Sequence, residues 1–449
     1  MNQNQLDQKR EWIKDKFIVG IDPAKDKHQA FIIDGSGYAV GKTFSFTHNA
    51  KGFHEQLWFK LSKYLEPEFI HPDHLIFAVE AAIDFWQPLV DYLHRQNFSV
   101  VIVSPLTTKR SRSLPGHDFT KTDPKDARLV AENAFQGHYH TYIDYPDQTK
   151  AMKTLSLTYN KLRKDLSKAH LRLRSMVNRV FPEFLSVVPL DTDTAHFLLS
   201  NYLHPGDFLN LDVSGTVAEM LKVSKQQHGM ESLSDLQKAA PTSIGIPRDT
   251  EEIICDRLTV NSWLVLINTL KEQLKIISTK LIELAKQTPW FNILTSVKGI
   301  SELTASLFLA EVRDLSKYDH YKQIQKLAGL NLRLNDSGRG HGRHKINKIG
   351  NRRLRWVVYM MTKETIKYTP EVRIKYLKRQ MKRYNYTKNI IACSGQLLQL
   401  IMALIKDNRC YEHFSENQSL VWELEYHYEI IKKDRNSKKK TPVSVPLTV

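Results

Sequence analysis

Two stretches of the chain repeat apolar residues at spacings that alternate between four and three. The first runs through Leu155, Tyr159, Leu162, Leu166, Ala169, Leu173, Met176 and Val180, and the second through Trp263, Ile267, Leu270, Leu274, Ile277, Leu281 and Leu284. This repeat gathers its side chains on one stripe of a helix, and a stripe of about three heptads is typical of coiled coils. We therefore expect two central coiled-coil arms, paired as a hairpin or across a dimer. Two ordinary bundle helices fit the pattern equally well.

The region before the first arm alternates between strand-sized and helix-sized segments. Apolar runs at 17–22, 28–34 and 39–46, with an Asp-Gly-Ser-Gly turn between the last two, predict three antiparallel strands. Helices are then expected at 52–64, 85–94 and 124–135, strands at 75–80 and 99–103, and a loop at 104–122. An α/β region in this order fits a ribonuclease-H-like fold.

Four acidic residues stand at strand ends or at a helix start in this region. Asp22 ends the first strand, Glu80 ends the fourth, and Asp123 and Asp126 share a face at the start of the last helix. Clustered carboxylates resist ionisation without a cation, and their hard oxygens suit Mg²⁺, with Mn²⁺ as an alternative. Two such ions can hold the attacking and leaving oxygens of a phosphodiester displacement.

Each of these acids also has a simpler interpretation. Asp26 competes with Asp22, Asp84 competes with Glu80, and Asp123 fits a plain helix N-cap. The four together, each at a strand end or a helix start, favour a metal site.

The C-terminal part contains a basic, glycine-rich segment at residues 333–355. It has eight Lys or Arg residues and one acid, Asp336, and its one hydroxyl side chain is Ser337. A serine oxygen can attack a DNA phosphate when a base takes its proton and cations stabilise the phosphorane, although Ser-Gly is also a common turn. The expected nucleic-acid contacts are Lys298, Arg339, Arg343, Lys345, Lys348, Arg352, Arg353 and Arg355.

Two further features of the C-terminal part point towards nucleic acid. Residues 297–300, followed by an apolar helix at 302–312, are similar to a helix-hairpin-helix element, although an ordinary helix–turn–helix explains them as well. Aromatic residues also alternate with basic ones between residues 352 and 386, and some of them are candidates for stacking on unpaired bases. These aromatic residues are Trp356, Tyr359, Tyr368, Tyr376, Tyr384 and Tyr386.

The charge balance narrows the class of partner. The chain has 65 Lys and Arg against 48 Asp and Glu, a net charge of +17, which favours nucleic acid or an anionic membrane surface over neutral partners. No apolar run approaches the roughly 20 residues of a membrane span, and the polar N-terminus lacks a signal-peptide core. Three cysteines without CxxC spacing fit a reducing cytoplasm rather than a disulfide framework or a zinc site.

These features predict four regions in the chain. An acidic metal-site domain is expected at 15–145, the arms at 146–289 with an insertion at 189–247, and a mostly helical serine domain at 290–410. A basic disordered tail is expected at 432–449.

The motifs, taken together, resemble the DEDD transposases of bacterial insertion sequences, a family that includes a site-specific pilin-gene invertase. The first set is Gly20-Ile21-Asp22, Glu80 and Lys121-Thr122-Asp123-x-x-Asp126-Ala127. The second set is Ser337-Gly338, Ile346-x-Lys348-x-Gly350-Asn351 and Leu354-Arg355. The resemblance covers about residues 15–135 and 290–365, with both motif sets in the family's order.

The resemblance implies a RuvC-like N-terminal domain in which Asp22, Glu80, Asp123 and Asp126 bind Mg²⁺. It implies that Ser337 is the nucleophile that becomes linked to DNA. It also implies a homo-oligomer, a dimer or a tetramer, in which the acidic site of one subunit works with the serine of another. A non-coding guide RNA from the element would select donor and target DNA, in the bacterial cytoplasm at the nucleoid.

One departure from the family pattern concerns the second acid. A small pair such as Thr-Gly is expected after the family glutamate, whereas this chain has Ala81-Ala82-Ile83-Asp84. The sequence therefore leaves open whether Glu80 or Asp84 reaches the metal.

Three hypotheses follow for function. The leading one is a transposase or recombinase that cuts and rejoins DNA through Ser337 with help from the Mg²⁺ site. The second is a metal-dependent nuclease or junction resolvase in which water attacks. The third is a nucleic-acid-binding protein without catalysis, which has no reason to keep four acids at one sheet edge.

Overall fold

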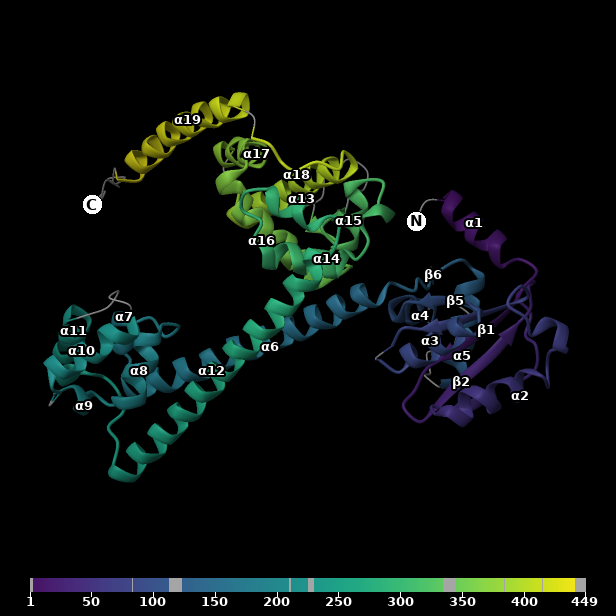
Figure 1. Cartoon of the computed structure of the whole chain (residues 1–449), viewed down its shortest axis with the longest axis horizontal. Helices are drawn as coiled ribbons and strands as arrows, with labels where there is room; N and C mark the ends of the chain where they lie inside the picture. Colours follow the sequence, from purple (N-terminus) through teal and green to yellow (C-terminus); the bar gives the residue numbers. More distant parts are fainter. Residues whose placement is uncertain are drawn as a thin grey trace, which may run out of the picture. The chain divides into compact units, whose positions relative to one another are not determined.

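A computed structural model of the chain describes residues 3–82, 84–112, 123–209, 211–224, 230–333, 345–382, 384–413 and 415–440. The chain divides into two compact units, Met1–Asp144 (unit 1) and Tyr145–Val449 (unit 2). Figure 1 shows the elements of both units.

Unit 1 is built on one mixed sheet of six strands in the order β3-β2-β1-β4-β5-β6. The central strands β1, β4 and β5 are parallel, and β2, β3 and β6 join antiparallel to their neighbours. The strands are β1 (Phe17–Asp22), β2 (Lys27–Ile33), β3 (Phe44–Thr47), β4 (Leu75–Glu80), β5 (Ser99–Val103) and β6 (His140–Thr141). The predicted α/β organisation is confirmed, with a third strand shorter than expected and the two-residue β6 not predicted.

Helices cover both faces of this sheet because the strands alternate their apolar side chains between the faces. Val19 and Ile21 of β1 face the core under α2 and α3, whereas Ile18 faces the core under α5. The helical segments are α1 (Gln3–Ile13), η1 (Gly52–Gln56), α2 (Leu57–Leu61), η2 (Pro67–Phe69), α3 (Trp86–Arg95), α4 (Pro105–Arg112) and α5 (Asp123–Phe135).

Helix α4 lies within the loop predicted at 104–122, so that prediction was wrong for residues 105–112. Its sequence lacks an apolar stripe, which hid it from periodicity. Ser104 begins the turn, with its carbonyl accepting from the Thr107 amide at 2.8 Å, and Pro105 at the first helical position has a backbone angle suited to a helix.

Unit 2 contains the two predicted long helices, α6 (Asp147–Val180) and α12 (Thr250–Lys286), which pack along each other within one chain (Figure 1). Gln148 at the start of α6 donates to the Leu284 carbonyl at 2.7 Å, and the Arg172 guanidinium lies 4.9 Å from the ring centroid of Trp263. The helices are therefore antiparallel, which favours the hairpin interpretation of the arms.

The helices between the two arms form a small cap, which begins before the insertion predicted at 189–247. Its segments are α7 (Phe184–Val187), α8 (Asp193–Asn201), α9 (Pro205–Leu209), α10 (Val213–Ser224), α11 (Met230–Ala239) and η3 (Ala240–Thr242). Phe184, Leu198 and Phe208 of the cap share one core with Leu173 of α6 and Ile267 of α12. Burial of the arms' apolar stripe against the cap thus accounts for the heptad pattern in this half of the hairpin.

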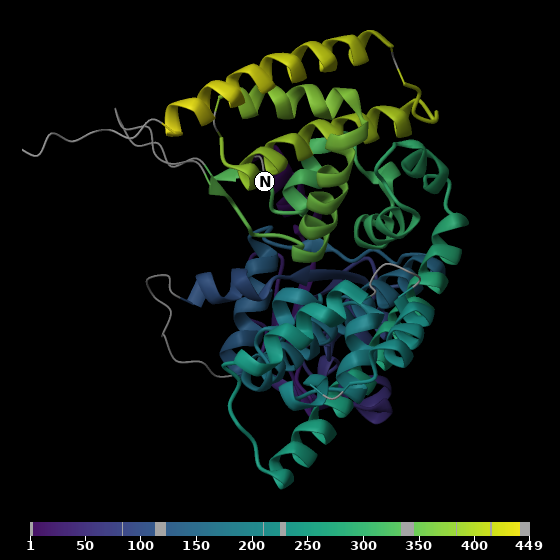
Figure 2. The same cartoon turned by 90° about the vertical axis from the view of Figure 1, so that its left-hand side faces the viewer.

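The remaining helices of unit 2 enclose a second core. They are α13 (Phe291–Ser296), α14 (Glu302–Val312), η4 (Leu315–Lys317), α15 (Tyr321–Leu327), α16 (Arg352–Tyr368), α17 (Pro370–Met381), α18 (Tyr386–Lys406) and α19 (Ser415–Lys440), with the short strands β7 (Leu332–Arg333) and β8 (Lys345–Ile346). Figures 1 and 2 both show α19 lying alongside α17, where Val421 and Leu424 pack on Leu377.

Two helices of this part of the chain, α19 and α18, bear on predictions made from the sequence. The basic tail predicted as disordered over 432–449 begins as helix, because α19 continues through Lys440 and lysine is a good helix former; residues 441–449 lie outside the described ranges. Among the described residues, α18 is the one helix with the length and composition of a membrane span, and half of its most apolar window is buried within the fold. Its residues Ile390, Leu397 and Ile401 belong to the core of unit 2, which accounts for its apolar character.

Candidate active site

The acidic cluster is assembled at the edge of the unit 1 sheet where two parallel strands end. Ile21 of β1 is paired with Val79 of β4, so Asp22 and Glu80, the next residues, leave the sheet side by side. Glu80 is buried, with 7% of its surface exposed, and its carboxyl hydrogen-bonds with Asp22 and with Thr108 of α4. Two of the four predicted acids are thus in direct contact.

Helix α5 brings a third acid, Asp126, to the same edge. Asp126 is 2% exposed and accepts a charge-assisted hydrogen bond from the Arg112 guanidinium of α4. Asp123 begins α5 as predicted, but its side chain lies outside what the structure describes. The competing acids Asp26 and Asp84 are exposed and do not line the cavity, so the geometry favours Asp22 and Glu80.

Gly20 sets how closely α5 approaches β1. A Cβ atom at this position would lie 2.5 Å from the Ala127 carbonyl oxygen and 2.5 Å from the Ala131 backbone nitrogen. These are backbone atoms that cannot rotate away, so the contact between β1 and α5 needs a residue without a side chain. Gly20 therefore fixes the separation of the elements that carry Asp22 and Asp126.

We expect Gly20→Ala to lower the free energy of unfolding by about 1–3 kcal/mol, since the added methyl group forces β1 and α5 apart. Denaturant unfolding of the full chain measures the change. Gly206→Ala is the matched control, because a Cβ at Gly206 meets nothing within 4 Å. Equal stability of the two variants would contradict the close-approach role of Gly20.

The three described acids line a cavity of about 410 Å³ together with several cations. Lys109 and Arg112 reach it from α4, and Lys25 reaches it from the turn after β1. The cavity thus combines a carboxylate floor with basic side chains at its wall, which suits a phosphodiester held against a cation.

The pKa of Glu80 reflects its burial among these charged side chains. Burial raises the pKa of the Glu80 carboxyl, and the neighbouring Asp126 charge raises it further, against the opposing effects of the hydrogen bonds from Thr108 and Asp22 and the Arg112 charge. The ionised form of Glu80 is therefore favoured by any additional positive charge in the cavity. Within the described ranges, no three acidic, histidine or cysteine side chains are placed to hold a metal ion, and Arg112 is the cation that contacts Asp126.

A pair of histidines, not predicted from the sequence, supports the turn that follows Asp22. His28 is fully buried; its Nδ1 accepts from the Ala24 amide at 3.3 Å, and its Nε2 lies 2.8 Å from Nδ1 of His48. Burial, and then the proximity of His48, lower the pKa of His28 to about 4. His28 is therefore neutral at neutral pH and able to accept this bond.

The serine segment is described only at its two ends. Ser337, Arg339 and Arg343 lie outside the described residues, as does the side chain of Lys345. The flanking strands β7 and β8 pair antiparallel, which brings the two ends of the segment together. We call β7 and β8 the serine hairpin, because the sequence between these two strands contains Ser337.

A buried acid, Glu311, holds the C-terminal end of this hairpin in place and was not predicted from the sequence. The Glu311 carboxylate of α14 accepts hydrogen bonds from Lys153, Ser156, Asn351 and Arg353. Burial alone would raise its pKa, but Lys153 and the other donors outweigh burial and the pKa of Glu311 is lowered. The ionised Glu311 therefore joins α14, α6 and the start of α16.

Two of the expected nucleic-acid contacts have partners inside the protein. Arg353 donates to Glu311 at 2.8 Å, and Arg355 donates to the carbonyls of Ala328 and Lys348 at 3.0 and 3.1 Å. Both guanidiniums thus hold the base of the serine hairpin. Lys298, Lys348 and Arg352 are exposed and remain available to a polyanion.

The glycine turn near Lys298 links α13 and α14, in agreement with the predicted helix–turn–helix arrangement. Gly299 has a φ of +99°, and a Cβ there would lie 2.8 Å from the α16 backbone at Glu364 and Thr365. Packing against α16 thus explains why this position is a glycine.

Comparison with known proteins gives two family matches. Residues 19–182 match a family model described as a transposase, and residues 291–377 match a model described as the transposase IS116/IS110/IS902 family. The first range contains the acidic cavity and the second contains the serine hairpin.

Two curated relatives extend these matches over most of the chain. An uncharacterised 44.8 kDa protein of insertion element IS116 from Streptomyces clavuligerus is 24% identical over 408 residues, covering 88% of this chain and 96% of the relative. An uncharacterised 43.6 kDa protein of insertion element IS110 from Streptomyces coelicolor is 21% identical over 297 residues, covering 65% of this chain and 72% of the relative. The first similarity also takes in the arms and the cap.

Proposed function

The chain belongs to the DEDD-type insertion-sequence transposases, in the IS116/IS110/IS902 family, and we propose that it cuts and rejoins DNA strands with its acidic cavity and Ser337. DNA is the substrate that this family membership implies. The observation that carries the proposal is the convergence of Asp22, Glu80 and Asp126 on one cavity at the edge of the unit 1 sheet. A protein that only binds nucleic acid has no physical reason to bury carboxylates together there.

We propose that the acidic cavity binds Mg²⁺, with Mn²⁺ as a substitute. The ligands would be Asp22, Glu80 and Asp126, joined by Asp123 from the first turn of α5. The oxygen-only donor set and the convergence of the three carboxyl groups on one cavity support a hard cation there. When bound, the metal would stabilise charge on the phosphate oxygens.

The chain's own residues have distinct roles in this proposal. Thr108 orients Glu80 through its hydrogen bond, Gly20 keeps Asp126 close to Asp22, and His28 holds the turn that follows Asp22. Arg112, which neutralises Asp126, would turn towards a phosphate once a metal takes over that neutralisation. The sheet order and the helices on both faces support a ribonuclease-H-like, RuvC-like unit 1.

Ser337 is proposed to attack the scissile phosphate. The bond from its Oγ to phosphorus forms as the bond from phosphorus to a deoxyribose oxygen breaks, and the hydroxyl proton passes to a base. Rejoining reverses this exchange when the hydroxyl of a second strand displaces the serine. The exposed cations Lys348 and Arg352 near the hairpin base support a polyanion beside it.

We further propose that the protein works as a homo-oligomer with donor and target DNA and a non-coding guide RNA, in the cytoplasm at the nucleoid. The net charge of +17 supports contact with several nucleic-acid strands. The antiparallel arms offer a long surface for such contacts.

A reconstituted reaction tests the proposed function. Purified chain, Mg²⁺, the transcript from the element's flank and matching supercoiled donor and target DNA are expected to give joined donor–target products. These products should be absent when the transcript or the metal is omitted. Nicked DNA with free ends would indicate a nuclease that uses water, and tight binding without cleavage would indicate a binding protein.

A further inference from the structure

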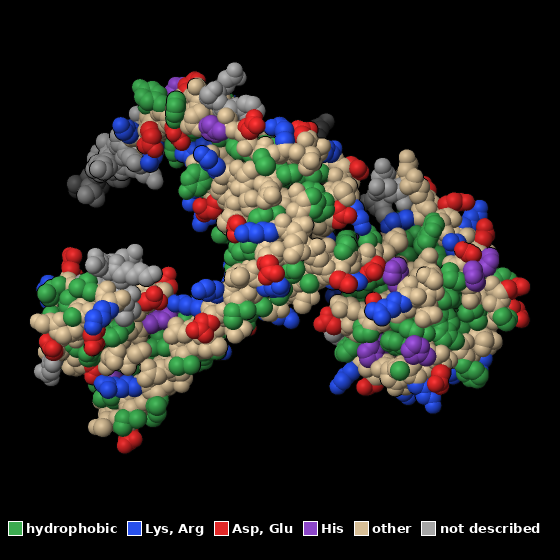
Figure 3. Space-filling model, viewed as in Figure 1, with side chains coloured by type: hydrophobic (Ala, Val, Ile, Leu, Met, Phe, Trp, Pro, Cys, Tyr) green, Lys and Arg blue, Asp and Glu red, His purple; other side chains and the backbone are tan. Residues whose placement is uncertain are grey.

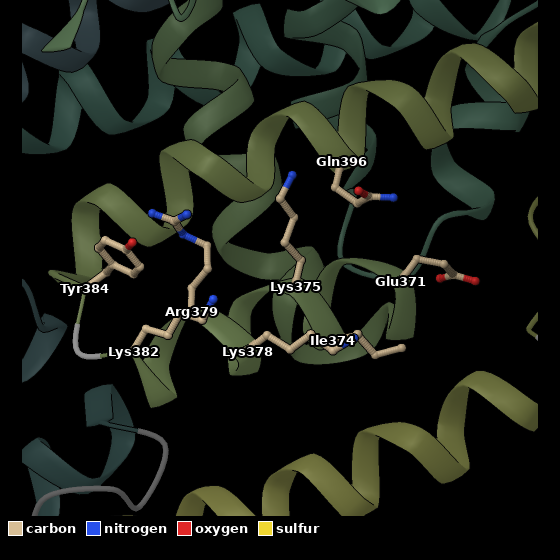
Figure 4. A pocket seen from close by; sticks show the side chains of 8 residues that line it. All are labelled: Glu371, Ile374, Lys375, Lys378, Arg379, Lys382, Tyr384 and Gln396. Carbon is tan, nitrogen blue, oxygen red and sulfur yellow. The ribbon is translucent and has the colours of Figure 1, made fainter. Parts of the chain in front are cut away.

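Helix α17 carries a stripe of cations that the catalytic proposal does not use. Lys378 and Arg379 lie three and four residues after Lys375, and Lys382, at the C-cap, lies four and three residues after them, so the four share one face. With Tyr384 they line a cavity of about 390 Å³, shown in Figure 4. We call these five residues the α17 groove.

The other sides of α17 are already occupied by neighbouring helices. Leu377 packs on Val421 and Leu424 of α19, and Arg373 donates to Glu425 of α19 at 2.8 Å. Helix α18 contacts α17 as well, and Asn389 of α18 accepts from Arg379. The groove is therefore a face that the fold keeps open, on a helix held firmly on its other sides.

The positive charge of the groove exceeds the negative charge of the one acid that lines the cavity, Glu371. None of Lys375, Lys378 and Lys382 has an ion-pair partner among the residues that the structure describes. The acid that lines the cavity, Glu371, accepts hydrogen bonds from the Tyr411 hydroxyl at 2.8 Å and the Asn417 amide at 3.0 Å. On the face of the molecule seen in Figure 3, by contrast, Lys and Arg side chains are interspersed with Asp and Glu.

The aromatic residue of the groove has the features of a stacking platform. Tyr384 is 46% exposed, and the Arg379 guanidinium lies 4.3 Å from its ring centroid. Arg379 is itself fixed by donating from Nε to Asn389 at 3.2 Å, so one side of the ring is supported and the ring remains accessible. An exposed tyrosine beside a row of cations suits an unpaired base whose phosphates follow the cations.

The length of the stripe fits more than one phosphate. Lys375 and Lys382 are seven residues apart, so their Cα atoms are separated by about 10 Å along the helix axis. Phosphates of one strand are spaced a few ångströms apart along a nucleic acid, so the stripe can contact successive phosphates of the same strand.

We propose that the α17 groove binds an unpaired nucleic-acid strand, with phosphates on Lys375, Lys378 and Lys382 and a base on Tyr384. The proposal goes beyond the catalytic function, because it assigns a separate binding surface to residues that neither cut nor join DNA. The family match in this region ends at residue 377, before four of the five groove residues.

Salt-dependent binding of the full chain tests this proposal. The variant Lys375→Gln/Lys378→Gln/Lys382→Gln is compared with Lys42→Gln/Lys51→Gln/Lys63→Gln, which removes the same charge from exposed lysines that line neither cavity. The probes are short single-stranded DNA and RNA of one sequence and the corresponding DNA duplex, in EDTA. Because no metal is present and no strand is cut, failure of the catalytic proposal would leave the result unchanged.

The groove variant is expected to bind single strands on the order of 100-fold more weakly at 0.1 M salt, with a slope of log K against log salt shallower by about 2. Tyr384→Ala should weaken binding by about 10-fold without changing the slope, and Tyr384→Phe should bind like wild type. A larger loss on RNA would identify the guide transcript as the ligand, and a larger loss on DNA would identify a displaced strand.

Two results would overturn the proposal. In the first, the groove variant and the control variant show the same slope and affinity on single strands. In the second, duplex binding falls as much as single-strand binding while Tyr384→Ala has no effect, which would assign the groove to paired nucleic acid. Circular dichroism of each variant checks that these surface substitutions leave the fold intact.

Discussion

Glu80→Gln is expected to lower the rate of strand exchange by about 1000-fold or more, while Asp84→Asn stays close to wild type. The amide of glutamine keeps the size of Glu80 and its capacity to hydrogen-bond with Thr108, but it cannot supply a negative charge to a cation. Asp84 lies four residues further on, is exposed, and does not line the acidic cavity. The pair therefore tests which acid the cavity uses, a question that the motif after Glu80 leaves open.

The measurement is the initial rate of donor–target joining at saturating Mg²⁺, with nucleic-acid affinity measured in parallel in EDTA. Unchanged affinity with a lost rate places the defect in the chemical step. If Asp84→Asn abolished joining and Glu80→Gln retained it, the assignment of the cavity acids would be wrong. If both variants joined strands at the wild-type rate, neither Glu80 nor Asp84 would take part in the mechanism.

Ser337→Ala is expected to lower the rate of strand joining by a still larger factor, since loss of the covalent serine nucleophile costs on the order of 10⁶ in a serine protease. The variant should keep wild-type affinity for nucleic acid, because a neutral hydroxyl adds little to binding that is dominated by phosphate charge. Ser316→Ala, at an exposed serine elsewhere in unit 2, is the matched control. Gel analysis of protease-sensitive, protein-linked DNA follows the covalent intermediate directly.

A Ser337→Ala variant that still cuts DNA would favour attack by water. In that case the acidic cavity would be sufficient for cleavage, and the serine hairpin would serve only to hold DNA. The same result would leave the Glu80→Gln prediction in place, so the two substitutions separate the two halves of the mechanism.

The elements best predicted from the sequence are those whose signal is local. Strands β1, β4 and β5 were placed correctly because each is a short apolar run between polar turns, and α6 and α12 because their apolar stripes persist for many turns. Helix α4 was missed because it buries little apolar surface. The two-residue strand β6 has no pattern of its own and exists only through pairing with β5.

In the acidic cavity, too, the positions that depend on local sequence were predicted and those that depend on tertiary contacts were not. The strand-end positions of Asp22 and Glu80 follow from the pattern of apolar runs, and their proximity follows from parallel pairing. Thr108, which hydrogen-bonds with Glu80, and Arg112, which pairs with Asp126, come from the unpredicted α4. Their roles depend on tertiary contacts, which leave no periodic trace in the sequence.

The basic segment near Ser337 shows that positive charge alone does not identify a nucleic-acid contact. Arg353 was expected to contact nucleic acid, yet it donates to Glu311, an acid 42 residues upstream on α14. Nothing in the sequence around Glu311 marks it, since it lies within an apolar helix that reads as core. A motif arginine can thus be required for the position of a hairpin rather than for contact with a phosphate.

The proposed mechanism is tested most directly by identifying the residue that becomes linked to DNA. The reaction is stopped during strand exchange, the DNA is digested, and the modified peptide is sequenced by mass spectrometry, with Glu80→Gln as the inactive control. We predict a nucleotide on Ser337 in the wild-type protein and no modified peptide in Glu80→Gln. A nucleotide on a different residue, or joined products without any modified peptide, would contradict the proposal that the acidic cavity and Ser337 act in one reaction.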